Sequence, residues 1–206
     1  MVVIDYDIRS GPASLLSMAR NPLRRSELAD AGLRLRAAEG ARGLTHRAID
    51  EEAAVPRGTT SNYFKTRADV IAGLIERIGE RLAPSAEVHS PLAAQPPSPD
   101  LFGAYIRDIV ARLLTNRDVT LALFELRLEA SRRPEIRDML GSWQRSNFAA
   151  DVEFNLAQGL PGGRKEVALF HYAIDGLLLD RLTYPIDPDT STDDVVDALV
   201  AGLLHP

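Results

Sequence analysis

The sequence contains no cysteine, and this absence removes several classes of protein at once. A disulfide-stabilised scaffold, a cysteine-ligated zinc site and a thiol nucleophile all need that residue. Long apolar runs are missing too: the stretch 198–204 has about seven residues with a glycine among them. A bilayer-spanning helix needs roughly 20. The N-terminus lacks a basic segment before an apolar stretch, so no signal peptide is expected. We therefore expect a cytoplasmic protein with no membrane contact.

Lysine is also scarce, since only Lys65 and Lys165 occur and arginine supplies the other basic residues. The net charge of −5 argues at first against a nucleic-acid partner. Residues 1–66 nevertheless carry 10 basic and 8 acidic side chains, whereas 67–206 carry 14 and 21. Charges farther apart than about 8 Å are largely screened at cellular salt, so the local balance matters most. This small basic excess is compatible with DNA binding in the first third, and chance would also produce it.

No segment alternates apolar and polar residues at the period of a strand, and the pattern is helical throughout. With 206 residues, 45% hydrophobic and 26% charged, the chain is long enough for a real core without crosslinks. We therefore predict an all-α protein. The expected helices cover about 24–39, 45–53, 57–64, 66–83, 99–115, 118–131, 134–158, 164–183 and 191–204.

Proline marks the expected domain boundary, because five of the 13 prolines fall within residues 84–99. We interpret 84–98 as a semi-extended linker. Residues 1–23 would form a flexible arm, 24–83 a helix-turn-helix domain with its connecting helix, and 99–206 a helical domain for effector binding and dimerisation.

The segment from Gly43 to Val70 has the spacing of a helix-turn-helix, with two short helices separated by a short break at Val55-Pro56. A support helix with an apolar stripe at Leu28, Ala31 and Leu35 precedes it. The outer face of the second short helix is polar, as reading of base edges requires. Phosphate contacts need hydroxyl groups, basic side chains and backbone N–H groups. The DNA-contact candidates are Thr45, His46, Arg47, Arg57, Gly58, Thr59, Ser61, Asn62, Tyr63, Lys65, Thr66 and Arg67.

This segment resembles the tetracycline-repressor (TetR) family of bacterial regulators. The matching residues are Leu44-Thr45, Arg47-Ala48-Ile49, Glu52-Ala53, Val55, Gly58, Tyr63-Phe64 and Arg67. The resemblance implies a repressor that binds double-stranded DNA and is released by a small organic effector. In that family the effector moves the fourth helix, here 66–83, and spreads the two reading heads.

Three positions depart from the family pattern. Ala54 occupies the turn position where glycine is usual, and would be strained if its φ is positive. Asp50 replaces a small alanine, and would either face outward or lower the affinity for DNA. Ser61 stands where an aromatic residue is common, so Tyr63 would take over that residue's phosphate contact.

The second half contains two helices, 164–183 and 191–204, that are apolar around much of their circumference. Pairing of these helices with those of a second copy would bury the surplus in a four-helix bundle, although burial within one subunit is the alternative. Such a homodimer would suit a palindromic operator. Helices 99–158 are expected to enclose an apolar pocket with a few polar groups. The candidate effector contacts are Phe102, Tyr105, Phe124, Leu128, Trp143, Asn147, Phe148, His171 and Tyr172.

Enzyme motifs are absent: the sequence has no GxSxG, GxGxxG or HExxH. The glycine-rich segment 159–165 follows a predicted helix and lacks the ending of a phosphate loop, so it is interpreted as a turn. We expect no cofactor and no metal, although His171 and Asp175 have the spacing of a ligand pair. The alternative to a DNA-binding regulator is a helical sensor or adaptor whose N-terminal head binds a protein partner.

Overall fold

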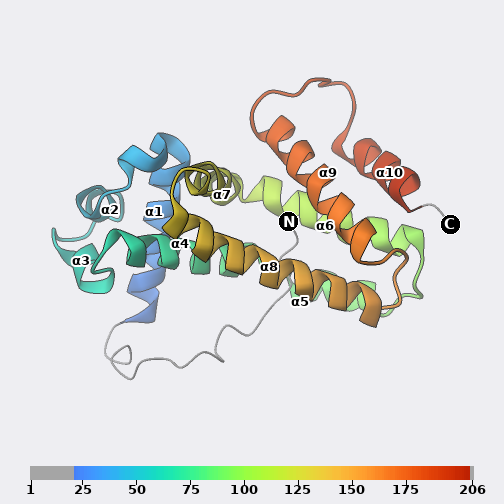
Figure 1. Cartoon of the computed structure of the whole chain (residues 1–206), viewed down its shortest axis with the longest axis horizontal. Helices are drawn as coiled ribbons and strands as arrows, with labels where there is room; N and C mark the ends of the chain where they lie inside the picture. Colours follow the sequence, from blue (N-terminus) through green and yellow to red (C-terminus); the bar gives the residue numbers. More distant parts are fainter. Residues whose placement is uncertain (1–20, 205–206) are drawn as a thin grey trace. The chain divides into compact units, whose positions relative to one another are not determined.

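A computed structural model describes residues 21–204, which form ten helices and no strand (Figure 1). The all-α prediction is therefore confirmed. The helices are α1 (Pro22–Gly43), α2 (His46–Glu52), α3 (Thr59–Tyr63), α4 (Arg67–Arg81), α5 (Ala86–Ala93), α6 (Pro99–Thr115), α7 (Arg117–Ala130), α8 (Pro134–Ala157), α9 (Arg164–Leu182) and α10 (Thr192–Leu203). None of these helices combines the length and apolar character needed to cross a bilayer.

Most of the predicted N-terminal arm lies outside the described residues. Its last positions are described and are not an arm, because α1 begins at Pro22. The Asn21 side chain caps this helix by accepting a hydrogen bond of 3.0 Å from the Leu23 N–H. Proline is well placed at the first helical position, where its missing N–H has no helical partner.

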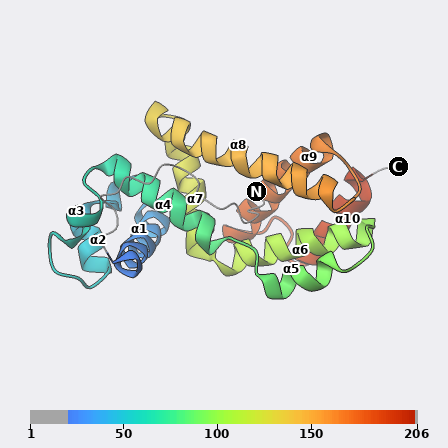
Figure 2. The same cartoon turned by 90° about the horizontal axis from the view of Figure 1, so that it is seen from below.

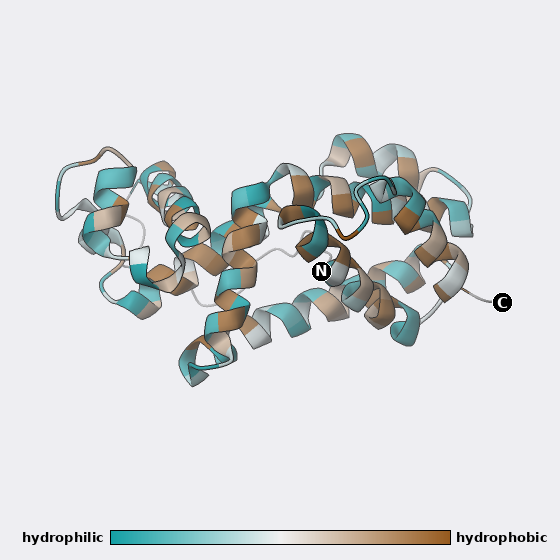
Figure 3. Ribbon diagram, turned by 90° about the horizontal axis from the view of Figure 1, so that it is seen from above, coloured by the Kyte–Doolittle hydropathy of each residue, from teal (hydrophilic) through white to brown (hydrophobic). Residues whose placement is uncertain are grey.

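The described chain divides into two compact units. The head unit comprises 21–81 and 118–143, and the body unit comprises 82–117 and 144–204. The chain order after the proline-rich segment placed 118–143 in a C-terminal domain of 99–206. By their packing, α7 and the start of α8 lie with the N-terminal helices. In each unit the hydrophobic residues recur in bands along the helices (Figure 3).

The head unit is built on α1, which packs against both α2 and α4. Leu28, Ala31 and Leu35 form its buried stripe as the periodicity predicted. Gly40 ends the regular helix with φ 65° and ψ −149°, and one further turn leads to Gly43. A left-handed φ favours glycine, so this residue redirects the chain toward α2.

In the body unit, α6 packs against α5, α9 and α10 (Figures 1 and 2). The helix α5 corrects the prediction of a semi-extended linker. Ser85 caps it through the Glu87 N–H, and Pro91 lies within it. An internal proline weakens a helix because it removes one hydrogen bond. The helix α5, which is capped by Ser85, nevertheless contains one. Counting prolines therefore gave the wrong local structure at this point.

Candidate nucleic-acid interface and ligand pocket

The turn between α2 and α3 contains two residues with left-handed backbone. Ala54 has φ 52° and Gly58 has φ 89°. Glycine adopts this conformation without steric cost, whereas in alanine the Cβ atom lies unfavourably close to the backbone carbonyl oxygen. The sequence departure at Ala54 is therefore a strained position, as predicted for a positive φ. At the other end of α2, Thr45 caps the helix by accepting a hydrogen bond from the Ala48 N–H at 3.1 Å.

Asp50 fastens α3 to α2. Its side chain is buried, with 2% of its surface exposed. The carboxylate accepts hydrogen bonds from the Gly58 N–H at 2.7 Å, the Thr60 N–H at 2.7 Å and the Thr60 hydroxyl at 2.6 Å. Burial raises the pKa of Asp50, but the hydrogen bonds from Thr60 and Gly58 outweigh it and hold the pKa below its usual value. Asp50 therefore faces inward, contrary to one sequence expectation, and organises the start of α3.

The other side of α3 is secured by Phe64, which follows the helix and is fully buried against α4. A Cβ atom at Gly73 of α4 would lie 2.4 Å from the Phe64 ring, so only glycine allows this close approach. The guanidinium group of Arg25 lies 5.0 Å from the centre of the same ring. Both flanks of α3 are thus fixed, and its remaining face points to solvent.

The exposed part of this segment contains most of the predicted DNA contacts. Ser61 and Asn62 of α3 are exposed, and so are Arg47, Arg57 and Lys65. Thr60, which precedes Ser61 on the same helix, is buried. The short helix therefore has one face turned into the protein and one polar face available to a partner, as DNA reading requires.

Several predicted contacts already have partners within the head unit. The His46 ring lies 2.8 Å from the Phe64 carbonyl oxygen. Thr59 donates to the Pro56 carbonyl, and Ser61 donates to the Gly58 carbonyl. Tyr63 is half-buried. These bonds define the local backbone, so the corresponding side chains have a structural role whatever they contact outside.

Thr66 and Arg67 anchor the start of α4. Thr66 and Asp69 form a capping box, in which the Asp69 carboxylate accepts from the Thr66 N–H at 2.8 Å and the Thr66 hydroxyl oxygen accepts from the Asp69 N–H at 3.1 Å. The Arg67 guanidinium donates to the carbonyls of Leu44 and Ala41 at 2.9 and 3.1 Å. The structure thus uses Arg67 to join α4 to the end of α1.

An acidic residue lies among the exposed arginines. Glu51 of α2 forms an ion pair with Arg47 at 2.9 Å, and its carboxylate is 3.9 Å from Arg57. All three side chains are more than half exposed. Such pairs are weak in water and would exchange readily for phosphate. Glu51 therefore lowers the positive charge of this face in the free protein.

A buried ion pair connects α1 and α7 inside the head unit. Arg36 has no exposed surface, and its guanidinium lies 2.5 Å from Glu129. Glu129 also pairs with Arg133 at 2.9 Å and with Arg67 at 3.4 Å. Burial raises the pKa of Glu129, but Arg36 and Arg67 outweigh it and hold the pKa below its usual value. The cluster explains why 118–143 folds with the head unit.

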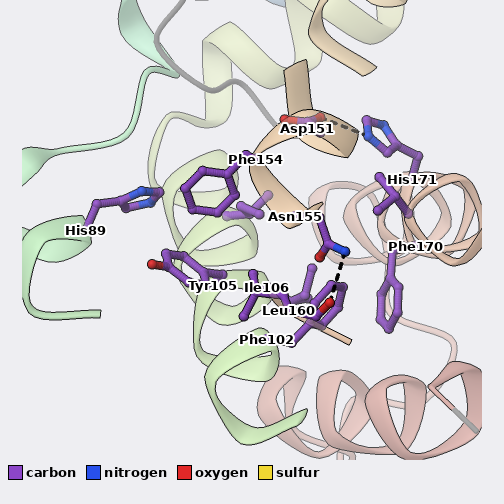
Figure 4. A pocket seen from close by; sticks show the side chains of 12 residues that line it. His89, Phe102, Tyr105, Ile106, Asp151, Phe154, Asn155, Leu160, Phe170 and His171 are labelled. Carbon is purple, nitrogen blue, oxygen red and sulfur yellow. Dashed lines mark hydrogen bonds and ion pairs between the residues drawn. The ribbon is translucent and has the colours of Figure 1, made fainter. Parts of the chain in front are cut away.

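The body unit contains an apolar cavity of about 50 Å³ (Figure 4). Its walls come from α5, α6, the second part of α8 and α9. The lining residues are His89, Phe102, Tyr105, Ile106, Ile109, Asp151, Phe154, Asn155, Leu160, Val167, Phe170 and His171. Most are hydrophobic or aromatic and a few are polar, which is typical of a small-molecule site.

Sequence reasoning placed only three of its nine effector candidates in this cavity, namely Phe102, Tyr105 and His171. Phe148 lies next to it, with its ring centre 5.4 Å from that of His171. Asn147 is buried in the body unit but does not line the cavity. Tyr172 is 71% exposed.

Three further candidates belong to the head unit: Phe124, Leu128 and Trp143. Leu128 is 56% exposed, and Trp143 packs near Gly79 of α4. Helical periodicity cannot tell which unit an aromatic side chain faces, and this is why these candidates do not line the cavity. The polar residues missed were His89, Asp151 and Asn155. The spacing of Asp151, Phe154 and Asn155 on one helix face would have indicated Asp151 and Asn155. No such pattern indicates His89, which lies on α5.

No cluster of three or more possible metal ligands occurs among residues 21–204. The His171 ring instead lies 3.0 Å from the Asp151 carboxylate. Burial raises the pKa of Asp151 to about 8. Burial also raises the pKa of Tyr105. The cavity therefore contains titratable groups in an apolar environment.

The fold and the two candidate sites together define an all-helical protein with a helix-turn-helix in its head unit and an apolar cavity in its helical body unit. Comparison with known proteins agrees. Residues 97–206 match the family model described as the tetracyclin repressor-like C-terminal domain. The chain therefore belongs to the tetracyclin repressor-like family of transcriptional regulators, whose members are not enzymes.

Solved structures with the same fold cover most of the chain. A TetR family member from Streptomyces coelicolor A3 is 26% identical over 90% of this chain and 100% of its own, with a TM-score of 0.66. The multidrug binding protein EbrR, complexed with imidazole, is 27% identical over 90% of this chain and 92% of its own, with a TM-score of 0.62. Its complex with ethidium gives 26% identity, coverage of 89% and 99%, and a TM-score of 0.63. No curated protein matches the chain.

Proposed function

We propose that the protein is a homodimeric repressor that binds a palindromic operator through α2 and α3. A small organic effector would bind the cavity of the body unit and release the DNA. The observation that carries the DNA-binding part is the one-sided exposure of α3: Asp50 and Phe64 fix its inner face, and Ser61 and Asn62 are presented to solvent. A short, rigid, polar helix is suited to the major groove.

We assign the contacts to DNA by exposure. Asn62 and Ser61 would read base edges, with Thr59 and Tyr63 beside them. Arg47, Arg57 and Lys65 would contact phosphates, because their charged ends are in solvent. The remaining candidates support these contacts by positioning the backbone, and they are Thr45, His46, Gly58, Thr66 and Arg67.

The exposed apolar face of α9 supports the dimer. Tyr172 is 71% exposed and Leu179 is 51% exposed. Gly176 lies between them in sequence, and a Cβ there would meet no atom within 4 Å. These three positions lie on one side of the helix at three- and four-residue spacing. A second copy packed here, together with α10, would remove this apolar surface from water.

The effector is supported by the cavity and by the comparison. EbrR is described as a multidrug binding protein and has been crystallised with imidazole, ethidium, proflavin and malachite green. The cavity of this chain, with apolar walls and a few polar groups, would likewise take a small organic molecule. Release requires only that the effector binds the DNA-incompetent conformation more tightly than the DNA-competent one.

The test of DNA binding begins with selection of random duplex DNA on the full-length protein. We expect an enriched inverted repeat, with an affinity that falls steeply between about 50 and 200 mM salt. Lys65→Ala should weaken binding to all sequences and reduce the salt slope by roughly one. Lys165→Ala removes the only other lysine and is the matched control. No enrichment and no affinity at about 50 mM salt would refute the proposal and favour a head that binds protein.

The bases contacted are tested with Asn62→Ala. We expect this variant to relax discrimination at particular base pairs while leaving the salt slope unchanged, because it removes no charge. The dimer is tested by sedimentation of Leu179→Glu, which should shift the protein toward a monomer. Leu156→Glu is the control, since Leu156 is 63% exposed on α8. A Leu179→Glu protein that stays dimeric would contradict the proposed interface.

A further inference from the structure

The cavity of the body unit contains oxygen atoms that have no hydrogen-bond partner within residues 21–204. These atoms are Asp151 Oδ1, Asn155 Oδ1 and the Tyr105 hydroxyl oxygen. All three residues line the cavity and each side chain is more than nine-tenths buried. Buried polar groups without partners are costly, so a site that contains several of them is suited to a ligand that satisfies them.

The orientation of Asn155 is fixed by its surroundings. Its amide nitrogen lies 3.4, 3.4 and 3.0 Å from the carbonyl oxygens of Leu160, Pro161 and Gly162. Carbonyl oxygens only accept hydrogen bonds, so the NH₂ group must face this turn. The amide oxygen of Asn155 is therefore the atom that lacks a hydrogen-bond partner. Asp151 and Asn155 are four residues apart on α8, so their side chains lie on one face of the helix (Figure 4).

The charges around Asp151 do not balance. His171 of α9 contacts its Oδ2 atom at 3.0 Å. From α6, Arg112 acts on Asp151 but also pairs with Asp108 at 3.1 Å. His89 of α5 lies 3.2 Å from the same Asp108 carboxylate. With neutral histidines, an ionised Asp151 and Asp108 would share one guanidinium, so among residues 21–204 an ionised Asp151 would lack a counter-charge of its own.

Two aromatic rings line the cavity near these acceptors. The rings of Tyr105 and Phe154 meet edge to face, with their centres 5.2 Å apart. Aromatic faces attract cations, and they also pack well against another ring. The small volume of the cavity favours a ligand with a single ring. The arrangement therefore combines apolar walls with a buried carboxyl group, one oxygen of which has no hydrogen-bond partner among residues 21–204, and further hydrogen-bond acceptors.

We propose that the cavity binds a protonated primary amine that carries one small aromatic or aliphatic ring, with Asp151 as its counter-ion and Asn155 as a second acceptor. This inference rests on the proposed function of the body unit as an effector-binding unit. The ammonium group supplies three N–H donors, which matches a cavity whose lining residues have unsatisfied oxygens. A neutral or anionic ligand would supply no counter-charge to an ionised Asp151.

The proposal predicts that binding of the amine is coupled to the release of a proton from Asp151. Burial raises the pKa of Asp151 to about 8, so the empty site holds a protonated carboxyl at neutral pH. The amine binds the ionised form, and the carboxyl proton leaves to solvent. Affinity should therefore fall about tenfold for each pH unit below 8, because the competent fraction falls by that factor. Protonation of His171 would act in the same direction, since it would compete for the same carboxylate.

The experiment is isothermal titration calorimetry on the full-length protein at about pH 8 with four one-ring probes. They are 2-phenylethylammonium, its N-trimethyl derivative, 2-phenylethanol and 3-phenylpropanoate. We expect the primary ammonium to bind at least about tenfold tighter than each of the others, since hydrogen bonds to charged groups carry the difference. Repetition at about pH 6.5 tests the coupling, and the probe itself remains protonated throughout.

Asp151→Asn keeps the shape of the side chain and removes its charge. We expect this variant to lose about tenfold or more in affinity for the ammonium, to lose the pH dependence, and to bind the alcohol as before. Glu153→Gln removes an exposed charge from the same helix and is the matched control. An unchanged melting temperature and circular dichroism spectrum establish that Asp151→Asn is folded. Equal ammonium affinity in Asp151→Asn and the parent would overturn the proposal.

The remaining outcomes separate the charge of the ligand from the existence of the site. Tighter binding of the alcohol or the carboxylate would overturn the ammonium inference and keep the effector pocket. Failure of every probe, whatever its charge, would overturn both the inference and the effector-binding part of the proposed function. The operator selection described above remains an independent test of DNA binding.

Discussion

Replacing Asp50 by alanine removes the carboxylate that holds the start of α3. The three donors that it satisfies belong to Gly58 and Thr60. Gly58 is exposed, so water can replace the lost partner of its N–H group. Thr60 is fully buried, and its N–H and hydroxyl groups would both be left without a partner. At about 1.5 kcal/mol for each buried donor, the docked conformation of α3 loses about 3 kcal/mol.

The assay is amide hydrogen exchange, because the perturbation is local. We expect the Thr60 amide of Asp50→Ala to exchange about 100-fold faster than in the parent protein, as 3 kcal/mol implies. Operator affinity should fall with it, since the reading helix is undocked. Asp50→Asn should recover only part of the loss, because its NH₂ group would face a backbone donor. Asp69→Ala is the control: it removes an exposed cap of α4 and should leave Thr60 protected.

The same residue predicts a pH dependence. The pKa of Asp50 is lowered in the folded protein, so its ionised form stabilises the head unit above the pKa of the unfolded chain. That contribution is lost as the pH falls below about 4, through the folded-state pKa. The protection factor of the Thr60 amide, which corrects for the intrinsic pH dependence of exchange, should therefore fall in that range in the parent and stay constant in Asp50→Ala. Thr60 protection and operator affinity that are both unchanged in Asp50→Ala would refute the reasoning.

Three other substitutions test the head unit. Glu51→Gln should increase operator affinity and steepen its salt dependence, because it frees two exposed arginines; unchanged affinity in a gel-shift titration would contradict this. Ala54→Gly should raise the free energy of unfolding by about 0.5–1 kcal/mol in urea denaturation, since glycine relieves the positive φ; a decrease would show that Ala54 is not strained. Glu129→Gln should lower it by about 3–5 kcal/mol, because Arg36 would remain buried without its counter-charge; a loss below 1 kcal/mol in the same assay would contradict that assignment.

The helices could be predicted because their signals are local. Ser98 before Pro99 and Ser191 before α10 are N-caps in the structure, and serine is a residue type that favours this position. The stripe on α1 also needs only neighbouring residues. The segment around α5 failed because proline content was weighed above the cap at Ser85. This helix of eight residues with a good cap forms in spite of one interior proline.

The grouping of helices in space could not be predicted, because it depends on pairs far apart in the chain. Arg36 and Glu129 are 93 positions apart, and nothing near either residue indicates the other. The same reason explains why only three of the effector candidates line the cavity. Phe124 and Phe102 occupy similar helical patterns, yet they belong to different units. Hydrophobic periodicity identifies a buried face but does not say which neighbour buries it.

Asp50 illustrates how a departure from a family pattern should be weighed. An acidic residue in a DNA-binding helix suggests repulsion of phosphate, and that expectation treats the side chain as solvent-exposed. Its spacing relative to Gly58 and Thr60, eight and ten residues later, points instead to a contact across the turn. Glycine there exposes its N–H, and threonine supplies two donors, so an acceptor on α2 is needed. Asp50 therefore stabilises the reading head by holding α3 in place. Its carboxylate is buried and hydrogen-bonded to Gly58 and Thr60, so it is not exposed to the phosphates of DNA.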